Sequence, residues 1–387
     1  MNNYTTILKY LFILAFPLFI ISCDSNEDDI AIEIIVPTNY DFLRDGVSTV
    51  SFSGQTTRLK QVDEIYSALN SNTYTEAQLD EMFADGAGFM DSTLNGTGKN
   101  VRGKTSAGCA AGNSATQAQF DAQIADFANN VVPAWANDAS AGVPGKLTDA
   151  TRSIHVNAKG HEIDQTFVKG LIGGMAVDQI VNNYLQPCQL DSGTRKDDNT
   201  NGVVASGKNY TDMEHKWDEA FGYLYGQVEK VSSTDLSTIT KDMSTGTTLW
   251  KYFVKIELKN QPGIGKIIFD AFKKGRAAIV AGDYQVRDAQ ANIIQIHLSK
   301  VIGYKAVDYL NDYMTKKAAG NTADAFHALS EGYGFVMSLQ FTNNGGNMPY
   351  FTKAEADAML AKMDDFWTVQ DADLTSMVSD IKSKFGI

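Results

Sequence analysis

Apolar residues recur at spacings of three and four through most of the chain after residue 56, which is the pattern of helices that bury one face. The first stripe contains Leu59, Val62, Tyr66 and Leu69. Capping signatures open several further stripes, and together they predict about ten helices joined mostly by short loops. The predicted helices begin near Thr56, at Thr75 and at Thr352, and otherwise cover Ser114–Val131, His161–Leu185, Tyr210–Gly226, Thr248–Leu258, Ile264–Ala281, Tyr284–Lys317, Asn321–Phe341 and Asp371–Phe385.

Strand-like text is confined to residues 30–55, in Ile30–Val36 and Val47–Gly54, and predicts a short hairpin or edge ribbon. Residues 86–113 and 190–209 are polar and are expected to form loops. The prediction is an all-α fold of packed helical bundles with a short β element near the N-terminus.

Acidic residues outnumber basic ones by 46 to 33, which gives the 387-residue chain a net charge of −13. Because nucleic acid requires a basic surface, this balance excludes nucleic acid as the expected partner. The hydrophobic fraction of 43% is typical of a globular protein with a buried core.

The first residues of the chain predict that the protein is located in the cell envelope. Lys9 precedes an apolar stretch, Tyr10–Ser22, of the length of a signal-peptide core. It ends at Cys23 in a sequence that resembles a lipobox, so Cys23 is expected to be lipidated and to become the first mature residue; an uncleaved membrane anchor is the alternative. We therefore expect an outer-membrane lipoprotein, on the cell surface or the periplasmic side. The predicted boundaries are a signal peptide at 1–22, an acidic tether at 23–35 and a helical domain at 36–387.

Two cysteines remain in the mature chain, Cys109 and Cys188. In an oxidising compartment they are expected to form a disulfide, although two buried free thiols are the alternative. The bond would close a long loop, and the chain-entropy model assigns such a closure roughly 4 kcal/mol.

Several polar residues interrupt the predicted apolar faces. Asp178 lies within the apolar face of the helix over 161–185, and Asp164 lies at its margin. A bare buried carboxylate costs several kcal/mol. Each aspartate is therefore expected either in a metal or acid–base site or in a structural bond to a neighbouring helix or a backbone amide.

Two pairs of residues have the four-residue spacing that lets both side chains reach one ligand. Glu214 and Asp218 form the first pair, and His327 and Glu331 form the second. Either pair could hold a cation. The alternatives are a solvated groove for the first pair and a surface hydrogen bond for the second.

Two motifs match known metal sites only in part. The segment His161–Gln165 has Gln165 where a zinc protease HExxH motif has its second histidine, which excludes that class of protease because an amide oxygen is a poor zinc ligand. The residues Asp197, Asn199 and Asn201 match the start of a calcium loop, but Lys208 occupies the position of the bidentate glutamate. A flexible polar loop is the alternative there.

These features together resemble a family of bacterial lipoproteins known only by a domain of unknown function and distantly similar to imelysin. Imelysin-like proteins are helical, contain two bundles, are associated with iron regulation and are named after a metallopeptidase activity. Their motif is G-x-H-x-x-E, and here Gly160 keeps the glycine while Glu162 and Gln165 replace the histidine and the glutamate. The resemblance therefore implies two packed bundles and, for any metal, an oxygen-preferring ion. The resembling segments are Tyr40–Phe42, Val50–Ile65, Lys159–Leu185, Tyr210–Gly226 and Ala325–Phe335.

Three functions follow as hypotheses. The first is a lipid-anchored, non-enzymatic binding protein of the cell envelope, linked to acquisition of iron or another metal. The others are a metal-dependent peptidase or hydrolase of imelysin type and a glycan-binding lipoprotein associated with a transporter. The cofactor is unknown, with a divalent metal, iron or calcium, as the candidate; the expected partners are the membrane, through the lipid on Cys23, and an outer-membrane transporter.

Sites in helical bundles are built from side chains that project into a shared interior. Polar groups that converge there can satisfy one another, which makes their burial tolerable. The helices over 161–185 and 210–226 are neighbours through one loop, and the resemblance implies that the helix over 321–341 accompanies them. We therefore expect one polar pocket between the bundles that contains Glu162, Gln165, Glu214 or Asp218, and His327 or Glu331.

Overall fold

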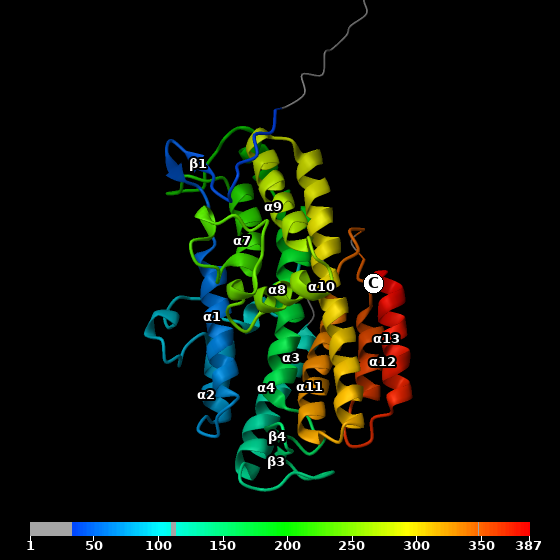
Figure 1. Cartoon of the computed structure of the whole chain (residues 1–387). Coiled ribbons are helices and arrows are strands. Elements are labelled where there is room, and N and C mark those ends of the chain that lie inside the picture. The colour runs from blue at the N-terminus through cyan, green and yellow to red at the C-terminus, as the bar shows by residue number, and fades with distance from the viewer. Residues whose placement is uncertain (1–32, 110–113, 347) are drawn as a thin grey trace, which may run out of the picture. The chain divides into compact units, whose positions relative to one another are not determined.

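The computed structural model describes residues 33–109, 114–346 and 348–387, which helices dominate (Figure 1). The predicted all-α fold is therefore confirmed. The predicted signal peptide and Cys23 lie outside the described residues. Within the described ranges, no helix combines the length and the apolar character needed to cross a membrane.

Ten helices carry most of the structure, and most of their bounds follow the predicted ones, although α4 is much shorter than the helix predicted over 161–185. They are α1 (Ser53–Ala68), α3 (Ser114–Asp126), α4 (Ile163–Leu171), α7 (Asp212–Tyr225), α8 (Leu249–Lys259), α9 (Ile264–Ala281), α10 (Tyr284–Ala318), α11 (Thr322–Ser338), α12 (Lys353–Lys362) and α13 (Asp371–Phe385). Three shorter helices are α2 (Glu76–Asp80), α5 (Pro187–Leu190) and α6 (Arg195–Thr200).

The long helix α10 organises residues 34–387, which form one compact unit. It packs against α9, α11 and α13, and α11 packs in turn against α4 (Figure 1). The buried apolar side chains of these helices form one connected cluster. Helices α4, α8, α10 and α11 thus belong to one packed body.

Local sequence explains where several helices begin. Thr75, Thr211 and Thr352 are N-caps whose hydroxyls accept the backbone N–H three residues on, and each forms a capping box. Asn321 is the N-cap residue of α11, as predicted, but its side chain makes no capping bond.

Small residues bring α4 and α11 into close contact. A Cβ atom at Gly334 of α11 would lie 2.8 Å from the backbone nitrogen of Gly170, and one at Gly173 would lie 2.3 Å from the Ser338 Cβ. The Ser338 hydroxyl also donates to the backbone oxygen of Lys169 at 3.0 Å. This close approach places the side chains of the two helices within reach of one another.

The β structure differs from the prediction. A short N-terminal hairpin is present, with β1 (Leu43–Arg44) antiparallel to β2 (Val47–Ser48), but its first strand lies after the predicted segment Ile30–Val36, of which residues 33–36 are described and form no strand. A second hairpin, β3 (Gly145–Thr148) with β4 (Ser153–Val156), was not predicted. The prediction that strands are confined to residues 30–55 was therefore wrong. Each of β3 and β4 has only four residues, too few for an alternation of apolar and polar residues to stand out in the sequence. Burial of Ile154 and Val156 against the helices holds this hairpin in place.

Two further expectations meet a mixed outcome. The predicted loop over 190–209 contains α6, and the predicted helix over 161–185 is interrupted by π-helical turns at Ile172–Val177 and Ile180–Tyr184. The disulfide between Cys109 and Cys188 is confirmed, with 6.3 Å between the Cα atoms. It ties the loop before α3 to α5.

Candidate functional site

A buried polar cluster lies where the start of α4 meets α11. Glu162 is the N-cap residue of α4, and its carboxylate lies 2.6 Å from Nδ1 of His327 on α11. Nε2 of the same imidazole lies 3.6 Å from a carboxylate oxygen of Glu331, one turn further along α11. The structure thus brings together Glu162, His327 and Glu331, as the sequence predicted.

Two other side chains complete the surroundings of Glu331. The Tyr252 hydroxyl of α8 donates to it at 3.1 Å, and the Lys169 ammonium of α4 lies 3.7 Å away. Lys169 is only 3% exposed, and its ammonium also lies over the rings of Tyr66 and Tyr252. The negative charge of the Glu331 carboxylate is therefore balanced by the Lys169 ammonium within the cluster.

Asp164 and Gln165 lie beside this group. A carboxylate oxygen of Asp164 accepts from the amides of Asn70 and Gln165, each at 2.8 Å. The Gln165 amide also donates to the Tyr66 hydroxyl at 3.1 Å. Gln165 therefore orients its neighbours through hydrogen bonds that the glutamate of the imelysin motif could not donate.

Burial sets the protonation of the cluster. It raises the pKa of Glu162 to about 8 and that of Asp164 to about 7, and it lowers the pKa of His327 to about 4. Burial also acts to raise the pKa of Glu331, but Lys169 and His327 outweigh it and hold that pKa below its usual value. At neutral pH the Glu162–His327 pair thus carries no net charge, and Glu331 is ionised.

Five side chains of the cluster, Gln165, Lys169, Tyr252, His327 and Glu331, form the inner wall of a cavity of about 440 Å³. Side chains from five helices and from the β3–β4 turn line this cavity, and every one of them carries a polar atom. Its lining residues are Tyr66, Arg152, Gln165, Lys169, Lys251, Tyr252, Lys255, Lys259, Lys305, Asp308, Tyr309, Asp312, Lys316, His327 and Glu331. We call this space the lysine cavity.

The structure does not bring Glu214 and Asp218 into the cluster, so this part of the predicted convergence is wrong. Arg276 of α9 lies between them, with its guanidinium 2.9 Å from Glu214 and 3.1 Å from Asp218. Arg44 binds Glu214 from the other side, and the Tyr40 hydroxyl donates to Asp218 at 2.7 Å. The physical reason is that the buried Arg276 supplies the cation that the two carboxylates require. The residue spacing on α7 gave no sign of this arginine, because it comes from another helix.

Asp178 also makes structural bonds. Its carboxylate accepts from the backbone N–H of Gly108 at 2.9 Å and from the Asn182 amide at 3.1 Å. These bonds tie the loop that carries Cys109 to the helix over 161–185. They match the structural alternative that the sequence left open for this residue.

The residues of the partial calcium motif lie on and just after α6. A helix turns about 100° per residue, so the Asn199 side chain points away from the face that carries Asp197 and Asn201. The Asn199 amide instead donates to the backbone oxygen of Ile279 at 2.8 Å and accepts from the Thr211 hydroxyl. The segment therefore lacks the shape of a calcium loop.

A metal fits this set of residues poorly. Across the described ranges, no three or more His, Cys, Asp or Glu side chains are arranged so that they could hold a metal ion. In the cluster itself, Glu162 and His327 bind each other and Glu331 binds Lys169 and Tyr252. The ligands that a metal would need are thus already engaged.

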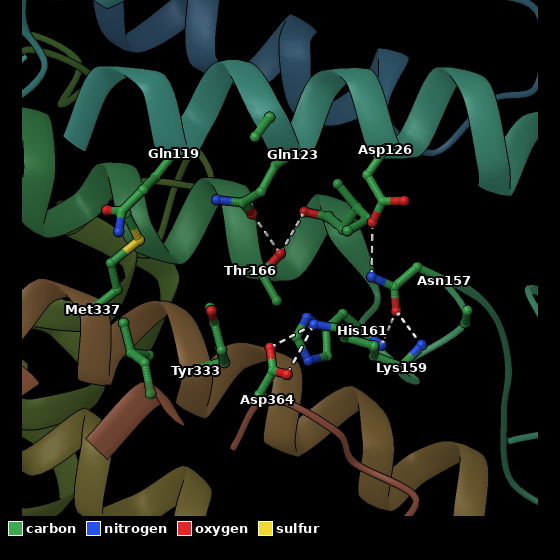
Figure 2. Close-up of a pocket in the computed structure, with 14 residues that line it drawn as sticks. Gln119, Gln123, Asp126, Asn157, Lys159, His161, Thr166, Tyr333, Met337 and Asp364 are labelled. Atoms are coloured by element: carbon green, nitrogen blue, oxygen red, sulfur yellow. Dashed lines mark hydrogen bonds and ion pairs between the residues drawn. The ribbon is translucent and has the colours of Figure 1, made fainter. Parts of the chain in front are cut away.

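A second cavity, of about 470 Å³, opens on the other side of α4 (Figure 2). Gln119, Gln123 and Asp126 project toward it from α3, and Tyr333 and Met337 project from α11. Most of its polar groups already bond to one another. Thr166 donates to Gln123, Asn157 donates to Asp126, and Lys159 forms an ion pair with Asp364.

His161 borders this second cavity and is largely buried. Its ring packs 4.3 Å from that of Phe366, and burial lowers its pKa to about 4. Among the described residues, its Nε2 atom has no hydrogen-bond partner. The first residue of the near-HExxH segment therefore points away from Glu162 and His327 and does not join them.

Sequence reasoning missed the basic residues of the lysine cavity. Lys251, Lys255 and Lys259 recur every four residues on α8, a spacing that also describes any solvated helix face. Arg152 lies in a turn between strands that were not predicted. One signal in the sequence could have indicated these lysines. A solvated lysine on a helix often has an acidic residue four positions away, but Thr247 lies four residues before Lys251 and Gly263 lies four residues after Lys259.

Comparisons with known proteins give a family and no function. No curated protein and no solved structure matches the chain. The model of the family described as "Domain of unknown function (DUF4856)" matches residues 37–387. The matched region includes both cavities and every element described above, so the chain belongs to the DUF4856 family.

Proposed function

We propose that this protein is a non-enzymatic binding protein of the cell envelope, anchored through a lipid on Cys23, that takes a small polar ligand into the lysine cavity. The observation that carries this proposal is the lining of the cavity. Sites for drug-like small molecules are usually lined by apolar side chains with a few polar groups, so a lining that is polar throughout indicates a polar ligand. Here all lining side chains are polar and come from five helices of one packed unit, so the space is formed before any ligand enters.

The same geometry favours binding over hydrolysis. A metallopeptidase needs a metal with an open coordination position and a base beside the activated water. Glu162 occupies the position of the histidine in the imelysin motif, and its carboxylate lies 2.6 Å from Nδ1 of His327, so neither group is available to hold a metal. Gln165 stands where that motif has its glutamate, and an amide cannot act as a general base.

A role in metal acquisition is compatible with this proposal if the metal is bound as a complex with a small molecule. Because the described residues fit a bare ion poorly, iron or another metal would reach the protein as a complex whose other donors come from a small molecule. The cavity would then contact that molecule. An outer-membrane transporter is the partner that such a lipid-anchored binding protein would serve.

The test is a ligand screen with a variant that fills the cavity. Full-length protein, purified in detergent, is screened for thermal stabilisation by small polar compounds, including sugars, amino acids and organic acids. Lys255→Trp places a large ring at the edge of the cavity, and Lys274→Trp, at an exposed position of α9, is the matched control. We expect a compound that stabilises the native protein and the control but not Lys255→Trp; the same stabilisation in all three would contradict the proposal.

A further inference from the structure

The lysine cavity has the opposite charge to the whole chain. The protein has a net charge of −13, yet seven basic side chains line this one cavity against three carboxylates. The basic side chains come from the β3–β4 turn, α4, α8 and α10, so the excess is not a property of one helix. They are Arg152, Lys169, Lys251, Lys255, Lys259, Lys305 and Lys316.

The nearby carboxylates are too few for these cations. Two aspartates each contact two of them: Asp324 lies 2.9 Å from Arg152 and 3.3 Å from Lys316, and Asp308 lies 3.3 Å from Lys259 and 3.0 Å from Lys305. Glu331 is paired with Lys169. The pairing therefore leaves net positive charge in the cavity.

Lys251 and Lys255 have no acidic partner within the described residues, where no carboxylate lies at ion-pair distance from either ammonium. They are four residues apart on α8, and like charges at that spacing repel each other. Partial burial, followed by the charges of Lys305, Lys251 and Lys169, lowers the pKa of Lys255 to about 8 despite the attraction of Glu331. A negative group placed between the two lysines would relieve this repulsion.

The inner wall of the cavity does not counteract this charge. Burial raises the pKa of Glu162 to about 8, so the Glu162–His327 pair carries no net charge at neutral pH. Asp164 does not line the cavity, because its side chain is buried and accepts hydrogen bonds from Asn70 and Gln165. Of the carboxylates that line the space, Asp312 alone lacks a basic partner in the described part of the chain, and it is exposed at the edge.

We propose that the ligand of the lysine cavity is a small anion with two or more carboxylate or phosphate groups, held between the lysines of α8 and the basic residues of α10 and the β3–β4 turn. This inference rests on the proposed binding function and narrows its ligand. Because these cations come from separate elements of the fold, an anion with two or three acid groups can pair with Lys251 and Lys255 of α8 and with Lys305 or Arg152 at the same time. Lysine is well suited to such a site because its ammonium donates three hydrogen bonds to oxygen acceptors.

Calorimetric titration of the full-length protein in detergent at low salt tests this. Citrate and pyrophosphate are the multivalent probes, which separate carboxylate from phosphate chemistry; acetate and sucrose are the comparisons. We expect citrate, pyrophosphate or both to bind at least tenfold more tightly than acetate and sucrose. We expect added sodium chloride to weaken this binding through screening.

The variant Lys251→Gln/Lys255→Gln should weaken binding of the multivalent probe at least tenfold. The control Lys274→Gln/Lys382→Gln removes two exposed lysines that form no ion pair with any residue the structure describes, and it should change this binding less than twofold. Thermal unfolding of each variant establishes that it is folded, and Lys251→Gln alone replaces the double variant if that one is not.

Three outcomes would overturn the inference: no multivalent probe binds, acetate or sucrose binds as tightly, or binding survives in Lys251→Gln/Lys255→Gln. The failure of the inference is distinguishable from failure of the proposed function. If a neutral compound stabilises the native protein and loses its effect in Lys255→Trp while no anion binds, the cavity is a binding site but not one for anions. If Lys255→Trp changes no binding at all, the cavity is not the binding site.

Discussion

Replacing Arg276 by methionine would test whether Glu214 and Asp218 belong to a structural network or to a ligand site. The Arg276 side chain is fully buried and lies 2.9 Å from Glu214 and 3.1 Å from Asp218, which are equally buried. Removing one partner of a buried ion pair costs about 3–5 kcal/mol, because the remaining charge is left uncompensated. Arg44 still binds Glu214, and Tyr40 still donates to Asp218. We therefore expect a loss of about 3 kcal/mol in the free energy of unfolding.

Urea denaturation at pH 7 measures this loss, and a second substitution assigns it. In Arg276→Met/Asp218→Asn the unpaired charge is absent, so part of the lost stability should return. Lys274→Met, at an exposed position on the same helix, should stay within about 0.5 kcal/mol of the native protein. A loss below about 1 kcal/mol in Arg276→Met would refute the structural reading, because it would mean that water or a ligand reaches the two carboxylates.

The dependence on pH follows from Asp218. Burial raises the pKa of this carboxyl to about 6 although Arg276 lowers it, and its usual value is 3.8. An acid whose pKa is higher in the folded state stabilises the fold most at low pH and loses that contribution as the pH rises through the folded pKa. Without Arg276 the pKa would rise further, so the deficit of Arg276→Met should shrink as the pH falls from 7 toward 4. A deficit that stays constant over this range would contradict the assignment.

Three further predictions concern the anchor, the disulfide and the cluster. Cys23→Ser should leave an unprocessed precursor without lipid label; normal processing, seen on a gel, would contradict lipidation. Cys109→Ala/Cys188→Ala should lose about 2–5 kcal/mol in urea denaturation, and a reductant should destabilise the native protein but not this variant. Because the pKa of Glu162 is raised from 4.5 to about 8, the native protein should lose stability as the pH rises between these values, and Glu162→Gln should lose less; parallel pH profiles would refute this.

The sequence alone determined the helical elements because their signals are local. Apolar spacing and capping residues act over a few positions, so the predicted bounds of α9 and α13 agree with the observed Ile264–Ala281 and Asp371–Phe385. Disulfide pairing of Cys109 with Cys188 was equally accessible, because only two cysteines remained after Cys23. The convergence of Glu162 with His327 or Glu331 was predicted from polar residues beside apolar faces and from the family resemblance, but the same reasoning also placed Glu214 or Asp218 there, which the structure does not.

Only the tertiary structure decided which polar residues meet. Arg276 lies 58 residues from Asp218 along the chain, and nothing on α7 reveals that α9 will place it there. The lysine cavity likewise requires α8 and α10 to face the α4–α11 contact, although each of its lysines taken singly looks like an ordinary surface residue. Ion pairs and cavities depend on how helices pack across long separations, whereas periodicity and caps depend on neighbours in sequence; this is why the helices could be predicted and the charge of the cavity could not.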